Sequence, residues 1–332
     1  MRFQVTAVVV SYNRQELLGE CLGGLLAQTR RPDRVIVVDN ASTDNAVAVA
    51  RAHALHPEIV QLHRNVGGAG GFCAGLAEAV RPLLLDYTPE GADTDDTPHY
   101  LWVMDDDTIP TPDALARLLH AVAACVGDTE MLPTVLGSKA LWTDGREHLM
   151  NKPRPRTFVR KGPAAIVGVP DSYQVRSLSF VSCLINAGAV IGTKRLPRAA
   201  YFLWNDDFEF TTGLLKRGLG YYVPTSEVVH KTKVFGSSDA DPGPRFYNEV
   251  RNKIWMARFS RDIFFPVEFA EFVLKTVRRW ILTFVHGSDR RQLLDCLVRG
   301  WHDGWRTRPE SNLEIFDDTP EIESALEALA RR

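Results

Sequence analysis

The sequence has few cysteines and no excess of charge of either sign. Its 332 residues include five cysteines, which are widely scattered and form no C-x-x-C pair. This usage argues against a disulfide scaffold and a zinc ribbon, and favours a reducing compartment, so we expect a cytoplasmic protein. A formal net charge of −2 argues against nucleic-acid binding.

Long hydrophobic runs are also missing. No stretch reaches about 18 apolar residues without charges, which argues against an ordinary membrane span. The N-terminus leads directly into a strand pattern, so we expect no secretory signal. An apolar fraction of 45% is sufficient for a real core. A chain of this length suggests about two domains, or one large α/β domain with an appendage.

Strands and helices alternate over the first hundred residues. Four apolar runs, largely β-branched, predict buried strands of a parallel sheet at residues 5–10, 34–38, 59–62 and 100–104. Helical periodicity predicts helices at residues 15–27 and 46–54, and a glycine-rich turn leads into a third helix that ends at residue 80. This order predicts right-handed βαβ units in a sheet of the nucleotide-binding type. The composition of residues 86–98 predicts a solvated insertion.

Three consecutive aspartates, Asp105 to Asp107, directly follow a predicted strand. Ligands of open α/β sheets bind outside the carboxyl ends of strands, so we expect these carboxylates at a crevice. There they could bind Mg²⁺ or Mn²⁺ and leave coordination positions for phosphate oxygens. The alternative is an acidic turn that caps the next helix. Asp39 favours the metal site, because it ends a neighbouring strand at the same edge.

Four glycines occur within Gly67–Gly71. Such a turn before a helix lets the backbone approach an anion closely. The spacing matches neither the dinucleotide fingerprint nor the P-loop. The turn therefore indicates a functional site only in combination with the aspartates.

Two adjacent carboxylates, Asp206 and Asp207, stand beside aromatic residues. An apolar wall raises the pKa of a carboxylate, which suits a general base. The alternative is an acidic helix start that complements the helix dipole. Further along, His230 is either structural or completes the metal site, where Lys231 or Lys233 could neutralise a diphosphate.

In this order, the motifs resemble those of family 2 inverting glycosyltransferases of the GT-A fold. The matching segments are Val9–Arg14, Val37–Asp44, Arg64–Gly68, Asp105–Asp107, Asn205–Glu209 and His230. Residues 65–72 and the triple aspartate are most similar to actinobacterial galactofuranosyltransferases of cell-wall galactan synthesis, although Asn205 departs from their acidic or aromatic residue. Residues 245–252 resemble a Tyr-Tyr-x-x-Arg-Asn motif of rhamnosyl- and galactofuranosyltransferase-like members.

The resemblance implies an α/β fold with a Rossmann-like mixed sheet flanked by helices over residues 1–238. Its donor half would be residues 1–110 and its acceptor half 111–238, followed by a mainly helical C-terminal extension over 239–332. The implied reaction transfers galactofuranose from UDP-galactofuranose to a hydroxyl of a glycan or lipid-linked acceptor of the cell envelope. The alternatives are a rhamnosyltransferase that uses dTDP-rhamnose, a nucleotidyltransferase, and a silent module that only binds nucleotide.

The resemblance also implies roles for individual residues. Asp207 would accept the proton of the acceptor hydroxyl, and Asp206 would orient the acceptor. A divalent cation, Mg²⁺ or Mn²⁺, would be held by Asp105, Asp107 and His230. The expected donor-binding residues are Ser11, Asn13, Arg14, Asp39, Asn65, Gly67, Gly68 and Asp105. The expected acceptor-binding residues are Trp204, Asp206, Tyr247 and Arg251.

An apolar, aromatic segment at residues 264–285 carries Lys275, Arg278 and Arg279. A helix of this kind could lie in a bilayer interface near a lipid-linked acceptor, at the inner face of the plasma membrane. The alternative is that it packs on the catalytic core or on a second copy of the chain, which would make a homo-oligomer.

Overall fold

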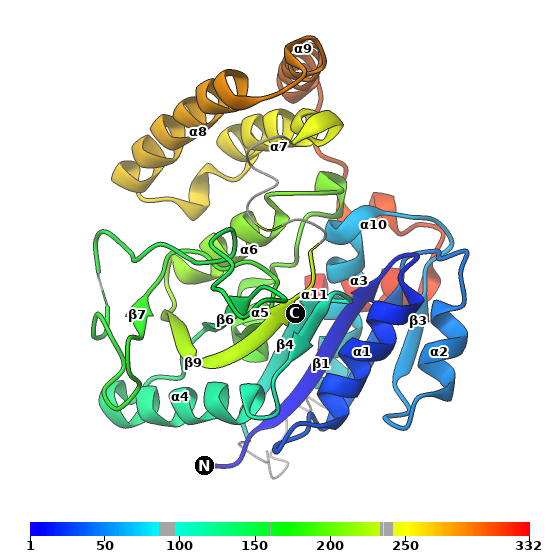
Figure 1. Ribbon diagram of the computed structural model, residues 1–332, viewed down its shortest axis with the longest axis vertical. Helices are drawn as coiled ribbons and strands as arrows, with labels where there is room; N and C mark the ends of the chain where they lie inside the picture. The colour runs from blue at the N-terminus through cyan, green and yellow to red at the C-terminus, as the bar shows by residue number, and fades with distance from the viewer. Residues whose placement is uncertain (86–96, 160, 233–234, 236–241) are drawn as a thin grey trace.

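The structure is a computed structural model that describes residues 1–85, 97–159, 161–232, 235 and 242–332. A twisted central sheet is flanked by helices, and helices of the C-terminal region stand together at one end of the molecule (Figure 1). Most of the predicted insertion, residues 86–96, and Lys233 lie outside the described residues. No described helix is both long and apolar enough to cross a membrane.

In the described residues the sheet is mixed, with strand order β3-β2-β1-β4-β8-β6-β9-β5, and β7 pairs with β9. Strands β1 to β4 run parallel, as predicted, and β8 pairs with β4 in the antiparallel direction. The strands are β1 (Gln4–Ser11), β2 (Arg34–Asp39), β3 (Glu58–Gln61), β4 (His99–Asp105), β5 (Thr108–Pro110), β6 (Val135–Leu141), β7 (Tyr173–Gln174), β8 (Cys183–Asn186) and β9 (Gly220–His230).

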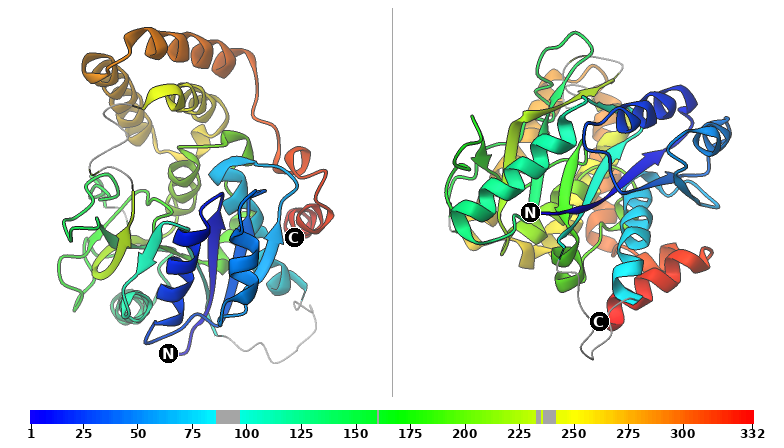
Figure 2. Two further views of the ribbon diagram at one scale, coloured as in Figure 1. Left: turned by 45° about the vertical axis from the view of Figure 1, so that its right-hand side comes forward. Right: turned by 90° about the horizontal axis from the view of Figure 1, so that it is seen from below.

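The helices cover both faces of the sheet and form the end of the molecule opposite the N-terminus (Figures 1 and 2). They are α1 (Gln15–Leu26), α2 (Ala46–Ala52), α3 (Gly67–Leu85), α4 (Ala114–Thr129), α5 (Ala187–Thr193), α6 (Asp206–Leu215), α7 (Phe246–Phe259), α8 (Pro266–His286), α9 (Arg290–Arg306), α10 (Asn312–Ile315) and α11 (Pro320–Arg331).

Helix α3 begins at Gly67, so the prediction of a glycine-rich turn ahead of the helix is wrong. The reason is close packing of the helix on the sheet. A Cβ atom on Gly71 would lie 2.5 Å from Val10 Cγ1, and one on Gly75 would lie 2.4 Å from Val8 Cγ1. These glycines therefore let α3 approach β1 more closely than any side chain would permit.

The core lies on both faces of the sheet, as the apolar runs predict. In β1, Val8 and Val10 face the cluster that contains α3, whereas Ala7 and Val9 face the cluster that contains α1 and α4. The C-terminal segment joins the first cluster, because α11 packs on α3 (Figure 2).

Candidate active site

The C-terminal ends of strands β1, β4 and β9 lie on the same side of the sheet. Val10 pairs with Asp105 across β1 and β4. Thr108, just after the three aspartates, pairs with His230 at the end of β9. The structure therefore brings the aspartates and the histidine together, although they are far apart in the sequence.

The middle aspartate, Asp106, organises the loop that follows β1. Its buried carboxylate accepts hydrogen bonds from Ser11 Oγ at 2.9 Å, from the Tyr12 backbone N–H at 3.3 Å and from Arg14 Nη1 at 3.1 Å. Burial raises the pKa of Asp106 to about 6, against the opposing effect of Arg14. Sequence reasoning gave Asp106 no role of its own.

Asp107 faces His230 and Arg14. Arg14 Nη1 donates to Asp107 Oδ2 at 2.6 Å, and His230 Nε2 lies 3.3 Å from Asp107 Oδ1. Burial alone would raise the pKa of Asp107, but His230 and Arg14 together lower it. Arg14, expected at the uridine, thus also pairs with the carboxylates that follow β4.

His230 is oriented by a residue that sequence reasoning missed. Asn151 Oδ1 lies 2.9 Å from His230 Nδ1, which leaves Nε2 directed at Asp107. The ring of His148 lies 5.2 Å from that of His230. Asn151 and His148 belong to irregular chain after β6, where no periodic pattern could mark them.

The paired carboxylates at the start of α6 are Asp206 and Asp207, and Asp206 lies close enough to the aspartates at the end of β4 for their charges to interact. Burial raises the pKa of Asp105 well above its ordinary value, and Asp107, Asp106 and Asp206 raise it further. Burial, followed by the charge of Asp207, raises the pKa of Asp206 to about 8. Negative charge is therefore crowded where β4 and α6 face each other.

This crowding bears on the expected metal. In the described part of the chain, no three His, Cys, Asp or Glu side chains stand in the arrangement of a preformed metal site. Asp107 Oδ1 is nevertheless buried, and His230 Nε2, at 3.3 Å, is the group that faces it. A buried carboxylate oxygen beside an imidazole nitrogen and further carboxylates fits a hard divalent cation.

The turn before α6 is held in an unusual backbone conformation. Trp204 and Asn205 both have φ of +70°, in the left-handed region that non-glycine residues rarely adopt. Asn252 of α7 clamps this turn, because its Nδ2 donates to the carbonyls of Leu203 at 3.1 Å and Trp204 at 2.9 Å. Glu249 Oε2 accepts from Asn205 Nδ2 at 2.8 Å. Residues of the 245–252 motif, Glu249 and Asn252, thus hold the start of α6 in place.

Asp207 itself is half-buried at the first turn of α6. The Phe208 backbone N–H donates to Asp207 Oδ1 at 2.6 Å. Burial raises the pKa of Asp207, and the Phe208 N–H, Lys253 and Arg279 partly oppose that shift. A carboxylate with a raised pKa can take a proton from a hydroxyl more readily than an ordinary aspartate.

The expected donor residues surround the loops after β1 and β2. Asn13 Oδ1 accepts from the Thr43 N–H at 2.7 Å, which joins the two loops. Asp39 is buried, and its Oδ1 accepts from the Ser42 N–H at 3.3 Å. Asn40 then ties β2 to α3, because its Nδ2 donates to Gly67 O at 2.9 Å.

Gly67, the first residue of α3, packs against Phe202 in the turn before α6. Its φ is +73°, and a Cβ atom there would lie 1.9 Å from Phe202 O, so only glycine fits. Asn65 Oδ1 accepts from the Gly67 N–H at 2.8 Å. A Cβ atom on Gly68 would meet nothing within 4 Å, so Gly68 borders open space.

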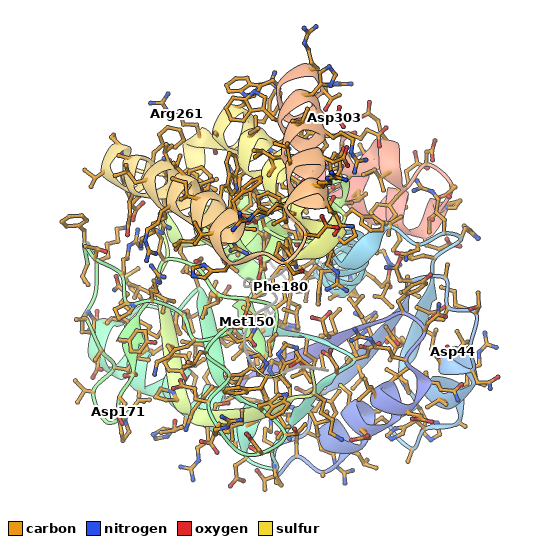
Figure 3. All side chains as sticks on the ribbon, turned by 45° about the horizontal axis from the view of Figure 1, so that its top comes forward. Asp44, Met150, Asp171, Phe180, Arg261 and Asp303 are labelled. Atoms are coloured by element: carbon orange, nitrogen blue, oxygen red, sulfur yellow. The ribbon has the colours of Figure 1, made fainter. Side chains whose placement is uncertain are left out.

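Two expected acceptor residues, Tyr247 and Arg251, have partners within the C-terminal region. Tyr247 Oη donates to Asp303 Oδ2 of α9 at 2.7 Å (Asp303 is labelled in Figure 3). Arg251 Nη2 donates to Tyr201 O at 3.1 Å, and its guanidinium lies 4.4 Å from the centre of the Trp255 ring. In the described residues no hydrogen bond or ion pair links these two side chains to Asp107 or His230.

Comparison with known proteins now identifies the family. The family model described as glycosyl transferase family 2 matches residues 6–129. The galactofuranosyltransferase GlfT1 of Mycobacterium tuberculosis (strain H37Rv) is 34% identical over 274 residues, which cover 76% of this chain and 82% of the relative. The chain belongs to glycosyl transferase family 2. The predicted family and enzyme class, a glycosyltransferase related to actinobacterial galactofuranosyltransferases, are thereby confirmed.

Other relatives agree with this assignment. GlfT1 of Mycolicibacterium smegmatis is 34% identical over 131 residues, and that match covers 40% of this chain and 39% of the relative. The crystal structure of Staphylococcus aureus TarS superposes with a TM-score of 0.56 at 14% identity, over 98% of this chain and 53% of TarS. TarS 1–349 in complex with UDP-GlcNAc gives 0.54 at 14% identity, over 99% and 91% of the two chains. These structures confirm the predicted GT-A fold with a helical C-terminal region.

Proposed function

We propose that this family 2 member transfers galactofuranose from UDP-galactofuranose, with inversion, to a hydroxyl of a glycan or lipid-linked acceptor of the cell envelope. The observation that carries the proposal is the electrostatic contact between the α6 carboxylates and the strand-end aspartates, one of which faces His230. The identity to the GlfT1 galactofuranosyltransferases supports the sugar. The UDP-GlcNAc complex of TarS supports a nucleotide-sugar donor for this fold.

The donor would lie against the loops after β1 and β2. Asp39 and Arg14 would hold the uridine, Ser11 and Asn13 would line the same loop, and Asn65, Gly67 and Gly68 would stand close to the sugar diphosphate. The hydrogen bonds that join these loops support this arrangement, because they hold the binding residues in place before the donor arrives.

The crowded carboxylates fit a divalent cation, Mg²⁺ or Mn²⁺, held by Asp105, Asp107 and His230. When bound, such a cation stabilises the negative charge that develops on the leaving nucleoside diphosphate. Arg14, which is paired with Asp107 at 2.6 Å, adds a fixed positive charge beside the same group.

Asp207 would act as the general base. The acceptor oxygen forms a bond to the anomeric carbon from the face opposite the nucleotide, the bond from that carbon to the diphosphate oxygen breaks, and Asp207 takes the hydroxyl proton. One direct displacement inverts the configuration. Asp206, whose pKa of about 8 keeps it largely protonated at neutral pH, would orient the acceptor by a hydrogen bond, with Trp204 against its apolar face.

The donor is tested by incubating the purified protein and an acceptor glycan with UDP-galactofuranose or dTDP-rhamnose, and measuring nucleoside diphosphate release. We expect release from UDP-galactofuranose at least tenfold faster. Faster release from dTDP-rhamnose would establish the rhamnosyltransferase instead. Pyrophosphate release from a nucleoside triphosphate would establish a nucleotidyltransferase.

We also propose that the protein works at the inner face of the plasma membrane through α8 and α9. One face of α8 is buried, with Phe272 and Thr283, and the opposite face is exposed. The exposed large apolar residues on the two helices include Val267, Val273, Leu274, Val277, Ile281, Val285, Leu294, Val298, Trp301 and Trp305. Basic residues accompany them, including Arg278 and Arg290, which suits an anionic lipid surface.

A further inference from the structure

The chain after β6, over residues 141–151, folds against the end of β9 and holds its own side chains in place. The His148 N–H donates to Ala140 O at 2.8 Å, which ties His148 to β6. The Asn151 N–H donates to His148 O at 2.9 Å. These backbone hydrogen bonds fix where the side chains of His148 and Asn151 lie.

Two side chains of the 141–151 segment hold the backbone that follows His230. The Trp142 Nε1–H donates to Thr232 O at 3.1 Å, and His148 Nε2 lies 2.9 Å from Thr232 Oγ1. The His148 ring is fully buried and lies 5.2 Å from that of His230. The 141–151 segment therefore restrains His230 through the chain beyond it as well as through its ring.

The His230 ring has an oxygen atom facing each of its nitrogens. Asn151 Oδ1 lies 2.9 Å from Nδ1, and Asp107 Oδ1 lies 3.3 Å from Nε2. A neutral imidazole carries a proton on one nitrogen only. Hydrogen bonds from N–H to oxygen are usually about 2.7–3.2 Å long, so the shorter contact is the better hydrogen bond. The distances favour a proton on Nδ1, which leaves the lone pair of Nε2 facing Asp107.

We propose that Asn151 is a positioning residue: its amide oxygen keeps the proton of His230 on Nδ1, so that Nε2 and Asp107 Oδ1 are both free to bind a divalent cation. An imidazole binds a metal through its unprotonated nitrogen, and the hydrogen bond at the other nitrogen decides which nitrogen that is. The inference rests on the proposed function, because the cation belongs to it. Asn151 itself would touch neither the cation nor the donor.

The role is tested by Mn²⁺ binding, followed by the electron paramagnetic resonance signal of the free ion, which requires no turnover. Asn151→Leu removes the amide oxygen at similar size, and we expect it to weaken Mn²⁺ binding at least tenfold. Asn151→Asp keeps an oxygen at this position and should bind Mn²⁺ at least as tightly as the unaltered protein. The matched control is Leu149→Ala, at a 67% exposed position of the same segment, which should leave Mn²⁺ binding unchanged.

A second measurement locates the proton without altering Asn151. In protein labelled with ¹⁵N-histidine and saturated with Mg²⁺ and UDP, the His230 signals are identified by their loss in His230→Gln. We expect Nδ1 to carry the proton and Nε2 to carry none. A proton on Nε2 would overturn the proposal, because Asn151 would then donate to His230 and hold it in the tautomer that cannot bind the cation.

His230→Gln separates this inference from the proposed function. If His230→Gln weakens Mn²⁺ binding at least tenfold and Asn151→Leu leaves it within twofold, the cation site stands and the positioning role of Asn151 is refuted. If His230→Gln binds Mn²⁺ as the unaltered protein does, His230 is not a ligand, and the proposed cation site and the role of Asn151 are both refuted.

Discussion

Three consecutive aspartates face three different environments, because successive residues at a strand end point in different directions. Asp106 turns toward the loop after β1, where Ser11 and Arg14 hold it. Asp107 turns toward His230, and Asp105 stays half-buried at the end of β4. The sequence predicted that Asp105 and Asp107 act together, but it could not show that Asp106 is occupied by the first loop.

The general base is testable by Asp207→Asn. The amide keeps the shape of the carboxylate but cannot accept the proton, so we expect kcat to fall by about 10² or more. UDP affinity, measured by calorimetry, should stay within twofold. The matched control is Asp171→Asn, at an exposed position just before β7 (labelled in Figure 3), which should leave kcat unchanged. Unaltered turnover in Asp207→Asn would assign the base to another residue.

The raised pKa of Asp206 predicts a pH dependence of stability. Its ordinary value is 3.8 and its folded value is about 8. The folded state therefore binds more protons than the unfolded state between these values, and the free energy of unfolding falls as pH rises through this window. The slope for one such group is on the order of 1 kcal/mol per pH unit.

Asp206→Asn removes this titration. In urea unfolding with a chelator present, we expect the variant to lose less stability than the unaltered protein between pH 5 and pH 8. An identical loss in both proteins would show that Asp206 does not carry the effect.

At the scale of elements, one face of α8 packs on the protein and the other is exposed, and contact of the exposed face with a bilayer stays a prediction. Leu274 and Ile281, at 71% and 58% exposure, lie on the open face. Leu274→Glu combined with Ile281→Glu should reduce co-sedimentation with vesicles of anionic phospholipid at least fivefold, because two charges would enter the apolar interface.

The control for this experiment is Leu149→Glu, at a position that is 67% exposed in the chain after β6. It should bind vesicles as the unaltered protein does. If the double variant instead changes the molecular mass measured by light scattering and keeps its vesicle binding, the exposed face is an interface between copies of the chain.

At the scale of the whole molecule, local patterns predicted most of the first hundred residues. The apolar runs of β1, β2 and β4 are buried on both faces and could be recognised from their residues alone. The partners of His230 and of the turn before α6 could not, because Asn151 and Asn252 act through contacts distant in sequence. The same limit explains why the first turn of α3 was expected as a loop, since its glycines meet residues distant in sequence, Phe202 at Gly67 and Val10 at Gly71.

The C-terminal region was expected as an extension that packs on the core or lies at a membrane surface, and its last helix packs in the central core. Ile322 of α11 is fully buried in the cluster that includes Val8 of β1 and Leu76 of α3. Arg64 Nη2 also donates to Ile315 O at 2.6 Å. Helix α3 begins at Gly67, which borders the proposed donor site. The packing of α11 on α3 therefore helps to hold that site in place.

Ile322→Ala tests whether the molecule unfolds as one unit. The lost burial and the cavity should lower the free energy of unfolding by about 2–5 kcal/mol. Leu313→Ala, at a residue that is 39% exposed in the same segment, should change it by only about 0.5 kcal/mol. If the C-terminal segment is part of one cooperative unit, urea unfolding of Ile322→Ala followed by tryptophan fluorescence and by circular dichroism will show one coincident transition at lower urea. An early, separate transition that leaves UDP binding intact would instead make residues 312–331 an independent appendage, and would remove the support that α11 gives to the donor site.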